Sequence, residues 1–179
     1  MLQRPVIVRL RNWVGDVILG VPAIQLLADH GYSPHLVGKG WSRPLLAGMG
    51  WPIEVRPAKL GDRVAQLRAL RRAARTVDPG FDRRENAMVL PTSFSAALEL
   101  RLAGLRAVGY AQEARGWLLG RSEPIVYGGH ALTSYWELAC RFLRIERAAP
   151  TSIELRTPAA DIERADALLH EHGIAPGFV

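Results

Sequence analysis

A chain of 179 residues, 49% of them hydrophobic, is long enough to bury a core of its own, and its length favours one domain. It contains no apolar run of about 18 residues, which excludes a membrane-spanning helix, and its first residues lack the pattern of a signal peptide. The single cysteine, Cys140, cannot form an internal disulfide, which favours a reducing cytoplasm, and no cysteines and histidines stand at metal-ligand spacing.

The formal net charge of +6 comes mostly from arginine and indicates an anionic partner. Nucleic acid, an acidic membrane surface and a phosphorylated saccharide all fit this charge. A nucleic-acid-binding protein would show a basic face interleaved with aromatic residues, or a known motif. Neither is present, so no nucleic-acid partner is expected.

The N-terminal stretch combines a strand, a turn and a helix. Residues 6–10 are an apolar run typical of a buried strand, residues 11–15 form a turn, and a helical pattern opens at Asp16. This is the first unit of an open α/β sheet, in which ligands bind outside the carboxyl ends of the strands. Gly15 is expected to let the backbone bend without a Cβ penalty. Asp16 is therefore expected at the lip of a ligand-binding crevice.

Two interpretations of Asp16 stay open on spacing alone. As an N-cap it would satisfy free amides at the start of the helix. As a general base it would take a proton from an incoming hydroxyl, and the helix amides would favour its charged form. Trp13, in the preceding turn, is either a stacking platform for a sugar or an apolar plug.

The rest of the chain alternates between strand and helix patterns. Strands are expected at residues 34–37, 52–55, 87–90, 107–110 and 124–127, and helices at 44–49, 62–76, 94–102, 134–142 and 159–172. Asp62 is expected to cap the second of these helices, Thr92 or Ser93 the third, and a Ser134–Glu137 capping box the fourth. The alternation predicts an α/β fold, a Rossmann-like, mostly parallel sheet with helices on both faces.

Two of the expected helices have distinct faces. The helix at 62–76 carries arginines on one face, which is either a solvated surface or a surface for acidic lipid head groups: Arg63, Arg68, Arg71, Arg72 and Arg75. The helix at 94–102 is expected to bury Phe94, Leu98 and Leu102.

Three collinear blocks carry a resemblance to a known family. They are Asn12-Trp13-Val14-Gly15-Asp16 followed by Pro22, residues 39–46 (KGWSRPLL), and residues 89–98 (VLPTSFSAAL). The first resembles the opening motif of the bacterial lipopolysaccharide heptosyltransferases of glycosyltransferase family 9, of the heptosyltransferase II type. The second resembles the family's segment after its second strand, and the third its VLPNS-type strand and helix. The resemblance covers most of the chain up to about residue 145.

The resemblance implies metal-independent, inverting transfer of heptose from ADP-heptose to the lipopolysaccharide inner core, with Asp16 as the catalytic base and no cofactor. Arg43, Arg63 and Arg115 would position the anionic acceptor, Arg115 by holding a carboxylate or phosphate in bidentate fashion. The full set of substrate-binding residues that it implies is Asn12, Trp13, Gly15, Arg43, Arg63, Thr92, Ser93 and Arg115. Capping alone would also explain Thr92 and Ser93.

The resemblance also implies GT-B architecture, in which two Rossmann-like domains close over a cleft. Residues 1–155 are then the N-terminal acceptor domain, and residues 156–179 are a helix and linker leading into a missing C-terminal donor domain. As such a half, the chain is expected to be inactive alone. It is expected in the cytoplasm, with the anionic inner-membrane surface as a partner. The alternative is a non-catalytic Rossmann-like module that binds a nucleotide or another anionic ligand.

Overall fold

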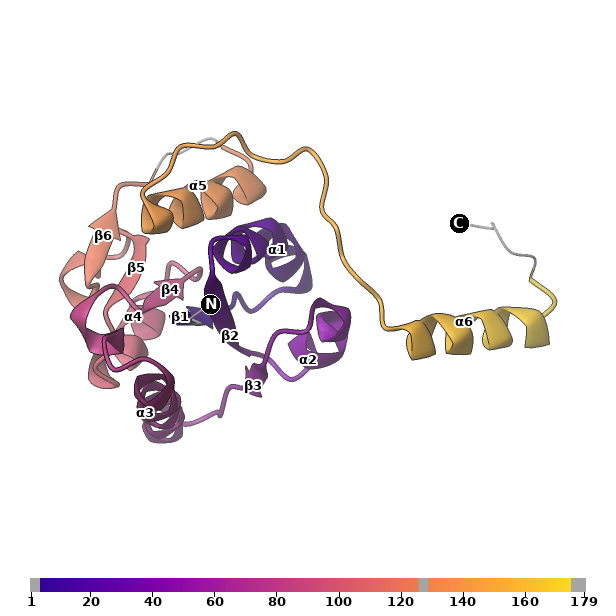
Figure 1. Ribbon diagram of the computed structural model, residues 1–179, viewed down its shortest axis with the longest axis horizontal. Coiled ribbons are helices and arrows are strands. Elements are labelled where there is room, and N and C mark those ends of the chain that lie inside the picture. Colours follow the sequence, from indigo (N-terminus) through magenta and orange to yellow (C-terminus); the bar gives the residue numbers. More distant parts are fainter. Residues whose placement is uncertain (1–3, 126–128, 175–179) are drawn as a thin grey trace.

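The computed structural model describes residues 4–125 and 129–174. The described residues form a parallel six-stranded sheet in the order β3-β2-β1-β4-β5-β6 (Figure 1). The strands are β1 Arg4–Arg9, β2 Tyr32–Gly38, β3 Ile53–Val55, β4 Ala87–Val89, β5 Ala107–Tyr110 and β6 Arg121–Glu123. This is the strand order of a doubly wound Rossmann-like sheet. The predicted fold class is confirmed.

Helices cover both faces of the sheet (Figure 1). One face carries α1 Val14–Asp29 and α5 Ala131–Leu143, and the other carries α3 Leu60–Val77 and α4 Phe94–Leu102. Short helical turns complete the connections, namely α2 Ser42–Leu45, η1 Ala47–Met49, η2 Phe81–Arg83 and η3 Gly116–Leu118. Within the described residues, no helix has the length and apolar character needed to cross a bilayer.

The central strand β1 explains why the sheet is covered on both sides. Val6 and Val8 pack into the core beneath α1 and α5, whereas Ile7 packs into the core beneath α3 and α4. All three are buried, as is usual for a central parallel strand whose two faces both carry helices. Arg9, the last residue of β1, is buried too, so this strand brings a charge into the interior.

Three helices begin earlier than predicted. α1 begins at Val14, α3 at Leu60 and α5 at Ala131, and the predicted caps Asp16, Asp62 and Ser134 lie inside the first or second turn. The cap of α5 is His130, whose Nδ1 accepts a hydrogen bond from the amide of Leu132. An acidic residue within the first turn is favoured by the helix dipole as well, so the sequence cannot separate it from a cap.

Two further expectations need correction. The last strand, β6, is Arg121–Glu123 and not residues 124–127, part of which lies outside the described residues. The helix α4 leaves Phe94 and Leu102 exposed and buries instead Ala96, Ala97, Glu99 and Leu100. A glutamate therefore faces the interior from α4.

The chain after α5 crosses the outside of the domain before it reaches the last helix, α6 Ala159–Glu171 (Figure 1). The indole nitrogen Nε1 of Trp136 donates to the carbonyl of Arg147 at 2.8 Å, and the amide of Arg156 donates to the sulfur of Met49 at 3.4 Å. Among the described residues of α6 none is buried. Residues 175–179, which complete the predicted linker, lie outside the described part of the chain.

Candidate functional site

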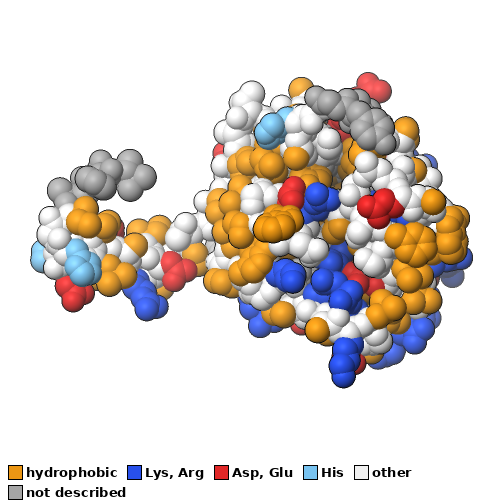
Figure 2. Space-filling model, turned by 180° about the vertical axis from the view of Figure 1, so that it is seen from behind, with side chains coloured by type: hydrophobic (Ala, Val, Ile, Leu, Met, Phe, Trp, Pro, Cys, Tyr) orange, Lys and Arg blue, Asp and Glu red, His pale blue; other side chains and the backbone are white. Residues whose placement is uncertain are grey.

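The candidate site lies where the direction of the sheet connections reverses, between the neighbouring strands β1 and β4. The chain leaves β1 for α1 on one face and leaves β4 for α4 on the other, which opens a crevice at the carboxyl ends of these strands. Figure 2 views the molecule from the side on which the strands end, and Lys and Arg side chains gather around the hollow in its middle. An anionic ligand would be attracted to this side.

Asp16 lies in this crevice, and both of its carboxylate oxygens have a partner. The hydroxyl of Tyr135 donates to Oδ1 at 2.9 Å, and Nε of Arg11 lies 3.5 Å from Oδ2. Arg11 also donates through Nη1 to the hydroxyl of Thr92 at 3.4 Å, so it bridges the ends of β1 and β4. The side chain of Asp16 is 21% exposed. Since these partners are side chains and α1 has no side-chain cap, the N-cap interpretation of Asp16 is wrong.

Tyr135 reaches Asp16 from α5, 119 residues further along the chain. Its ring packs over Gly20, one turn after Asp16, where an added Cβ would lie 3.9 Å from Cδ2 of Tyr135. Burial raises the pKa of the Tyr135 hydroxyl well above its usual range, and the hydrogen bond to Asp16 raises it further. Tyr135 therefore stays protonated and remains a donor.

A cavity of about 300 Å³ opens beside this group, at the lower end of the range for ligand pockets. Its wall combines polar and apolar surface, and it includes the two partners of Asp16. The lining residues are Arg11, Leu90, Thr92, Tyr110, Gln112, Ile125, Gly129, Ala131, Ser134 and Tyr135. The hydroxyl of Tyr110 donates to the carbonyl of Ser134 at 2.5 Å, which ties β5 to α5 across the cavity. Burial raises the pKa of Tyr110 to about 12.

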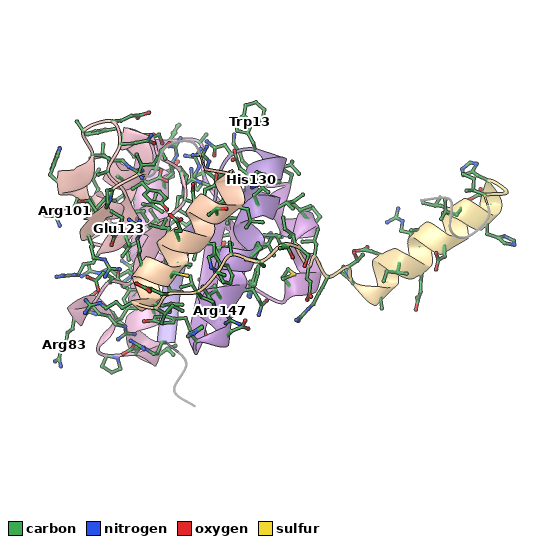
Figure 3. All side chains as sticks on the ribbon, turned by 90° about the horizontal axis from the view of Figure 1, so that it is seen from above. Trp13, Arg83, Arg101, Glu123, His130 and Arg147 are labelled. Carbon is green, nitrogen blue, oxygen red and sulfur yellow. The ribbon has the colours of Figure 1, made fainter. Side chains whose placement is uncertain are left out.

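The turn before α1 stands at the mouth of the site. Asn12, Trp13 and Gly15 are all exposed, and Trp13 projects into solvent at the same end of the molecule as His130 (Figure 3). With 76% of its surface exposed, Trp13 is not an apolar plug. Gly15 lies inside α1, and a Cβ there would meet nothing within 4 Å. The expectation that Gly15 serves a backbone bend is wrong.

Arg63 belongs to a second group of charges, on the other face of the sheet. Glu99 of α4 is only 1% exposed, and its Oε1 accepts from Nε of Arg9 at 2.6 Å. Its Oε2 lies 3.6 Å from Arg56 and 3.4 Å from Arg63. Burial lowers the pKa of Arg9, and the neighbouring Glu99 carboxylate opposes this shift. We call these four residues the Glu99 cluster, and three guanidiniums around one carboxylate leave it strongly positive.

Arg115 is fully buried, unlike a residue that binds a ligand directly. Its Nε donates to the carbonyl of Tyr110 at 2.9 Å, and its Nη1 donates to the carbonyls of Pro91 at 2.6 Å and Ser93 at 3.2 Å. Burial lowers the pKa of its guanidinium to about 10. Arg115 thus joins the loops after β4 and β5, and the expected bidentate grip on an acceptor carboxylate does not fit this position.

Replacing Arg115 with glutamine is expected to lower the free energy of unfolding by about 2 kcal/mol, because buried carbonyl oxygens lose their donors. Urea unfolding followed by circular dichroism measures the change. Arg43→Gln is the matched control. Arg43 is 60% exposed and is expected to contribute less than about 1 kcal/mol. Equal losses from both variants would contradict the structural role of Arg115.

The remaining predicted residues divide between the crevice and the edge of the sheet. Thr92 lines the cavity, and its hydroxyl accepts a hydrogen bond from Arg11. Ser93 is the N-cap residue of α4, but its side chain makes no capping hydrogen bond. Arg43 donates to the carbonyl of Ile53 at 3.0 Å, which places it against the edge strand β3. Asp16 and Thr92 are therefore the two predicted residues that Arg11 joins directly.

The sequence interpretation missed five residues of the Asp16 group and the Glu99 cluster, namely Arg9, Arg11, Arg56, Glu99 and Tyr135. One signal was present for Arg9, since a charged residue in an otherwise apolar buried strand requires a partner in the interior. Tyr135 lies in the helix predicted at residues 134–142, but its hydroxyl partner 119 positions away leaves no trace in the local sequence. Within residues 4–125 and 129–174, no three His, Cys, Asp or Glu side chains are grouped as a metal site requires.

The fold is that of the bacterial heptosyltransferases and related enzymes of glycosyltransferase family 9. E. coli ADP-heptose lipopolysaccharide heptosyltransferase II shares 22% sequence identity with the chain and superposes with a TM-score of 0.70 over 96% of it. A glycosyltransferase of family 9 from Veillonella parvula shares 11% identity with a TM-score of 0.74 over 98% of the chain. The E. coli heptosyltransferase WaaC bound to ADP-2-deoxy-2-fluoro heptose shares 17% identity with the chain, with a TM-score of 0.58 over 95% of it.

These similarities confirm the expected resemblance at the level of the fold. The sequence matches no family model and no curated protein. The chain spans about half the length of the first two solved structures, 51% of each, and 67% of the third.

Proposed function

We propose that this chain is the acceptor-binding half of an inverting glycosyltransferase that moves heptose from ADP-heptose to the lipopolysaccharide inner core. The observation that carries the proposal is the position of Asp16. Its carboxylate lies at the switch point of a heptosyltransferase-like sheet, beside a cavity lined in part by its own two partners, Arg11 and Tyr135. Solved proteins with this fold include a complex with ADP-2-deoxy-2-fluoro heptose, which supports a nucleotide-sugar donor.

In the proposed reaction Asp16 acts as the general base. Its carboxylate takes the proton of the acceptor hydroxyl, and the acceptor oxygen then bonds to the anomeric carbon of the heptose. The bond from that carbon to the diphosphate breaks on the opposite side, ADP leaves with the electron pair, and the configuration inverts. Positive groups of the donor half would stabilise the charge that develops on ADP. No step of this proposal requires a metal.

The acceptor is held by residues around the crevice. We place its sugar in the cavity beside Arg11 and Thr92, with Trp13 at the mouth as a stacking surface and Asn12 beside it. Gly15 leaves the start of α1 open, because a side chain there would point into free space. The positive charge of the Glu99 cluster, which includes Arg63, attracts an anionic acceptor to this side.

The proposal divides the chain in two. Residues 1–155 form the acceptor domain, and residues 156–179 connect it to a donor-binding domain. The exposed position of α6 supports a connecting role. The enzyme would work in the cytoplasm at the inner face of the inner membrane. Arg68, Arg72 and Arg75 remain exposed on α3 for anionic head groups, whereas Arg63 turns inward to Glu99.

The test combines binding by this chain with turnover by the full-length gene product. Heptose-deficient inner-core oligosaccharide is expected to shift the amide resonances of Thr92, Gln112 and Ser134 in the 179-residue chain, in a saturable manner. The full-length product is expected to form the heptosylated acceptor from ADP-heptose. ADP alone shifting the same resonances, without turnover, would contradict the proposal and favour a non-catalytic nucleotide-binding module.

A further inference from the structure

We propose that Tyr135 is the positioning residue of the catalytic carboxylate, so that the site includes α5 as well as the strand ends. The inference rests on the proposed function, because it takes Asp16 as the general base. Its basis is the hydrogen bond of 2.9 Å from the Tyr135 hydroxyl to Oδ1 of Asp16. The hydroxyl is the only part of the side chain that this role requires.

The two oxygens of Asp16 are held unequally. Oδ1 receives the short hydrogen bond from Tyr135, whereas the contact of Oδ2 among the described residues is the longer one of 3.5 Å with Nε of Arg11. Fixing Oδ1 restricts the rotation of the carboxylate and leaves Oδ2 for the proton of the acceptor. Within the described part of the chain, the side chain of Arg11 contacts Asp16 at 3.5 Å and Thr92 at 3.4 Å, and because both contacts are long we expect Arg11 to follow the acceptor.

The packing of α5 explains why the tyrosine can hold one position. Leu138, Ala139 and Phe142 of the same helix are buried in the core beneath α1 and α5. The ring of Tyr135 is itself only 6% exposed and packs over Gly20. A donor held on a packed helix positions a carboxylate more precisely than a donor on a surface loop.

Tyr135 is also suited to this role chemically. Its hydroxyl keeps its proton, because burial raises its pKa well above the usual range and the neighbouring carboxylate raises it further. A simple core residue at this position would need no hydroxyl, and phenylalanine would pack equally well. The hydroxyl is part-buried, and its acceptor among the described residues is Asp16, which favours a role in holding this carboxylate.

The first measurement uses the 179-residue chain and requires no activity. A buried tyrosine hydroxyl that donates to a carboxylate is expected to give a protected proton resonance in the NMR spectrum, which disappears in Tyr135→Phe and moves in Asp16→Asn. A resonance that Asp16→Asn leaves in place would overturn the contact, and so would the absence of any such resonance in the wild type.

The second measurement uses turnover of the full-length gene product. Tyr135→Phe is expected to lower kcat about tenfold and to change KM for the acceptor less than twofold, because the carboxylate loses its orientation and the acceptor contacts stay. In the Asp16→Asn background the same change is expected to have no effect on kcat, since the two residues act as a pair. An equal loss in both backgrounds, or wild-type kcat for Tyr135→Phe, would overturn the positioning role.

Tyr32→Phe is the matched control. The ring of Tyr32 packs edge-on against Phe142 of α5, with 5.4 Å between the ring centroids. Tyr32 is the first residue of β2, so it lies at the amino ends of the strands, away from the site at their carboxyl ends. It is expected to keep wild-type kcat and KM. Failure of the proposed function would give a different result. Wild-type turnover by Asp16→Asn, or no turnover by the wild type, would overturn the role of Asp16 itself. The NMR resonance would then test only the hydrogen bond between Tyr135 and Asp16.

Discussion

Replacing Asp16 with asparagine is expected to reduce kcat of the full-length gene product by at least about a hundredfold, the usual scale of general-base catalysis. Asparagine keeps the shape of the side chain and an oxygen that accepts from Tyr135, so the packing around α1 is preserved. It loses the carboxylate that takes the proton from the acceptor in the proposed reaction. The measurement is initial-rate turnover with ADP-heptose and a heptose-deficient core acceptor.

Acceptor binding separates catalysis from folding in this experiment. The 179-residue chain with Asp16→Asn is expected to bind the acceptor within about threefold of the wild type, because the cavity lining is unchanged. Its thermal unfolding midpoint is expected to stay within a few degrees of the wild type, as for a conservative change at a partly exposed position. Equal turnover by both proteins would show that Asp16 is not the base.

The fold could be predicted because its signals are local. Buried apolar runs such as residues 6–10 and 107–110 alternate with helical periods, and this alternation determines a parallel sheet with helices on both faces. The strand at 107–110 agrees with β5 at both ends. Helix starts were less accurate, because an aspartate at the cap and an aspartate in the first turn are favoured by the same positive end of the helix.

The candidate site could be predicted only where one segment carries it. A short turn joins β1 to α1, and Asp16 lies in the first turn of that helix, so the sequence places this carboxylate at the ligand-binding edge of the sheet. Tyr135 joins the site through the packing of α5 against α1, which no local pattern encodes. Arg115 shows the opposite error, since an arginine in a polar loop gave no sign that it would be fully buried among carbonyl groups.

The stability of the fold is predicted to depend on Glu99. Replacing it with glutamine is expected to lower the free energy of unfolding by about 3 kcal/mol, because Arg9 stays buried without a compensating charge. Arg56 and Arg63 are less buried, with 14% and 19% of their side chains exposed, and are expected to turn toward water. The measurement is a urea unfolding curve, in which the midpoint shifts and the slope is unchanged.

The double variant Arg9→Met with Glu99→Leu tests whether the loss comes from an unpaired charge. Removing both members of a buried ion pair and filling their volume with apolar groups is often neutral, so this variant is expected to unfold within about 1 kcal/mol of the wild type. The comparison also bears on acceptor binding, because the Glu99 cluster loses one positive and one negative charge together and its net charge stays the same. A double variant as unstable as Glu99→Gln would show that packing around Glu99, and not the unpaired charge of Arg9, accounts for the loss.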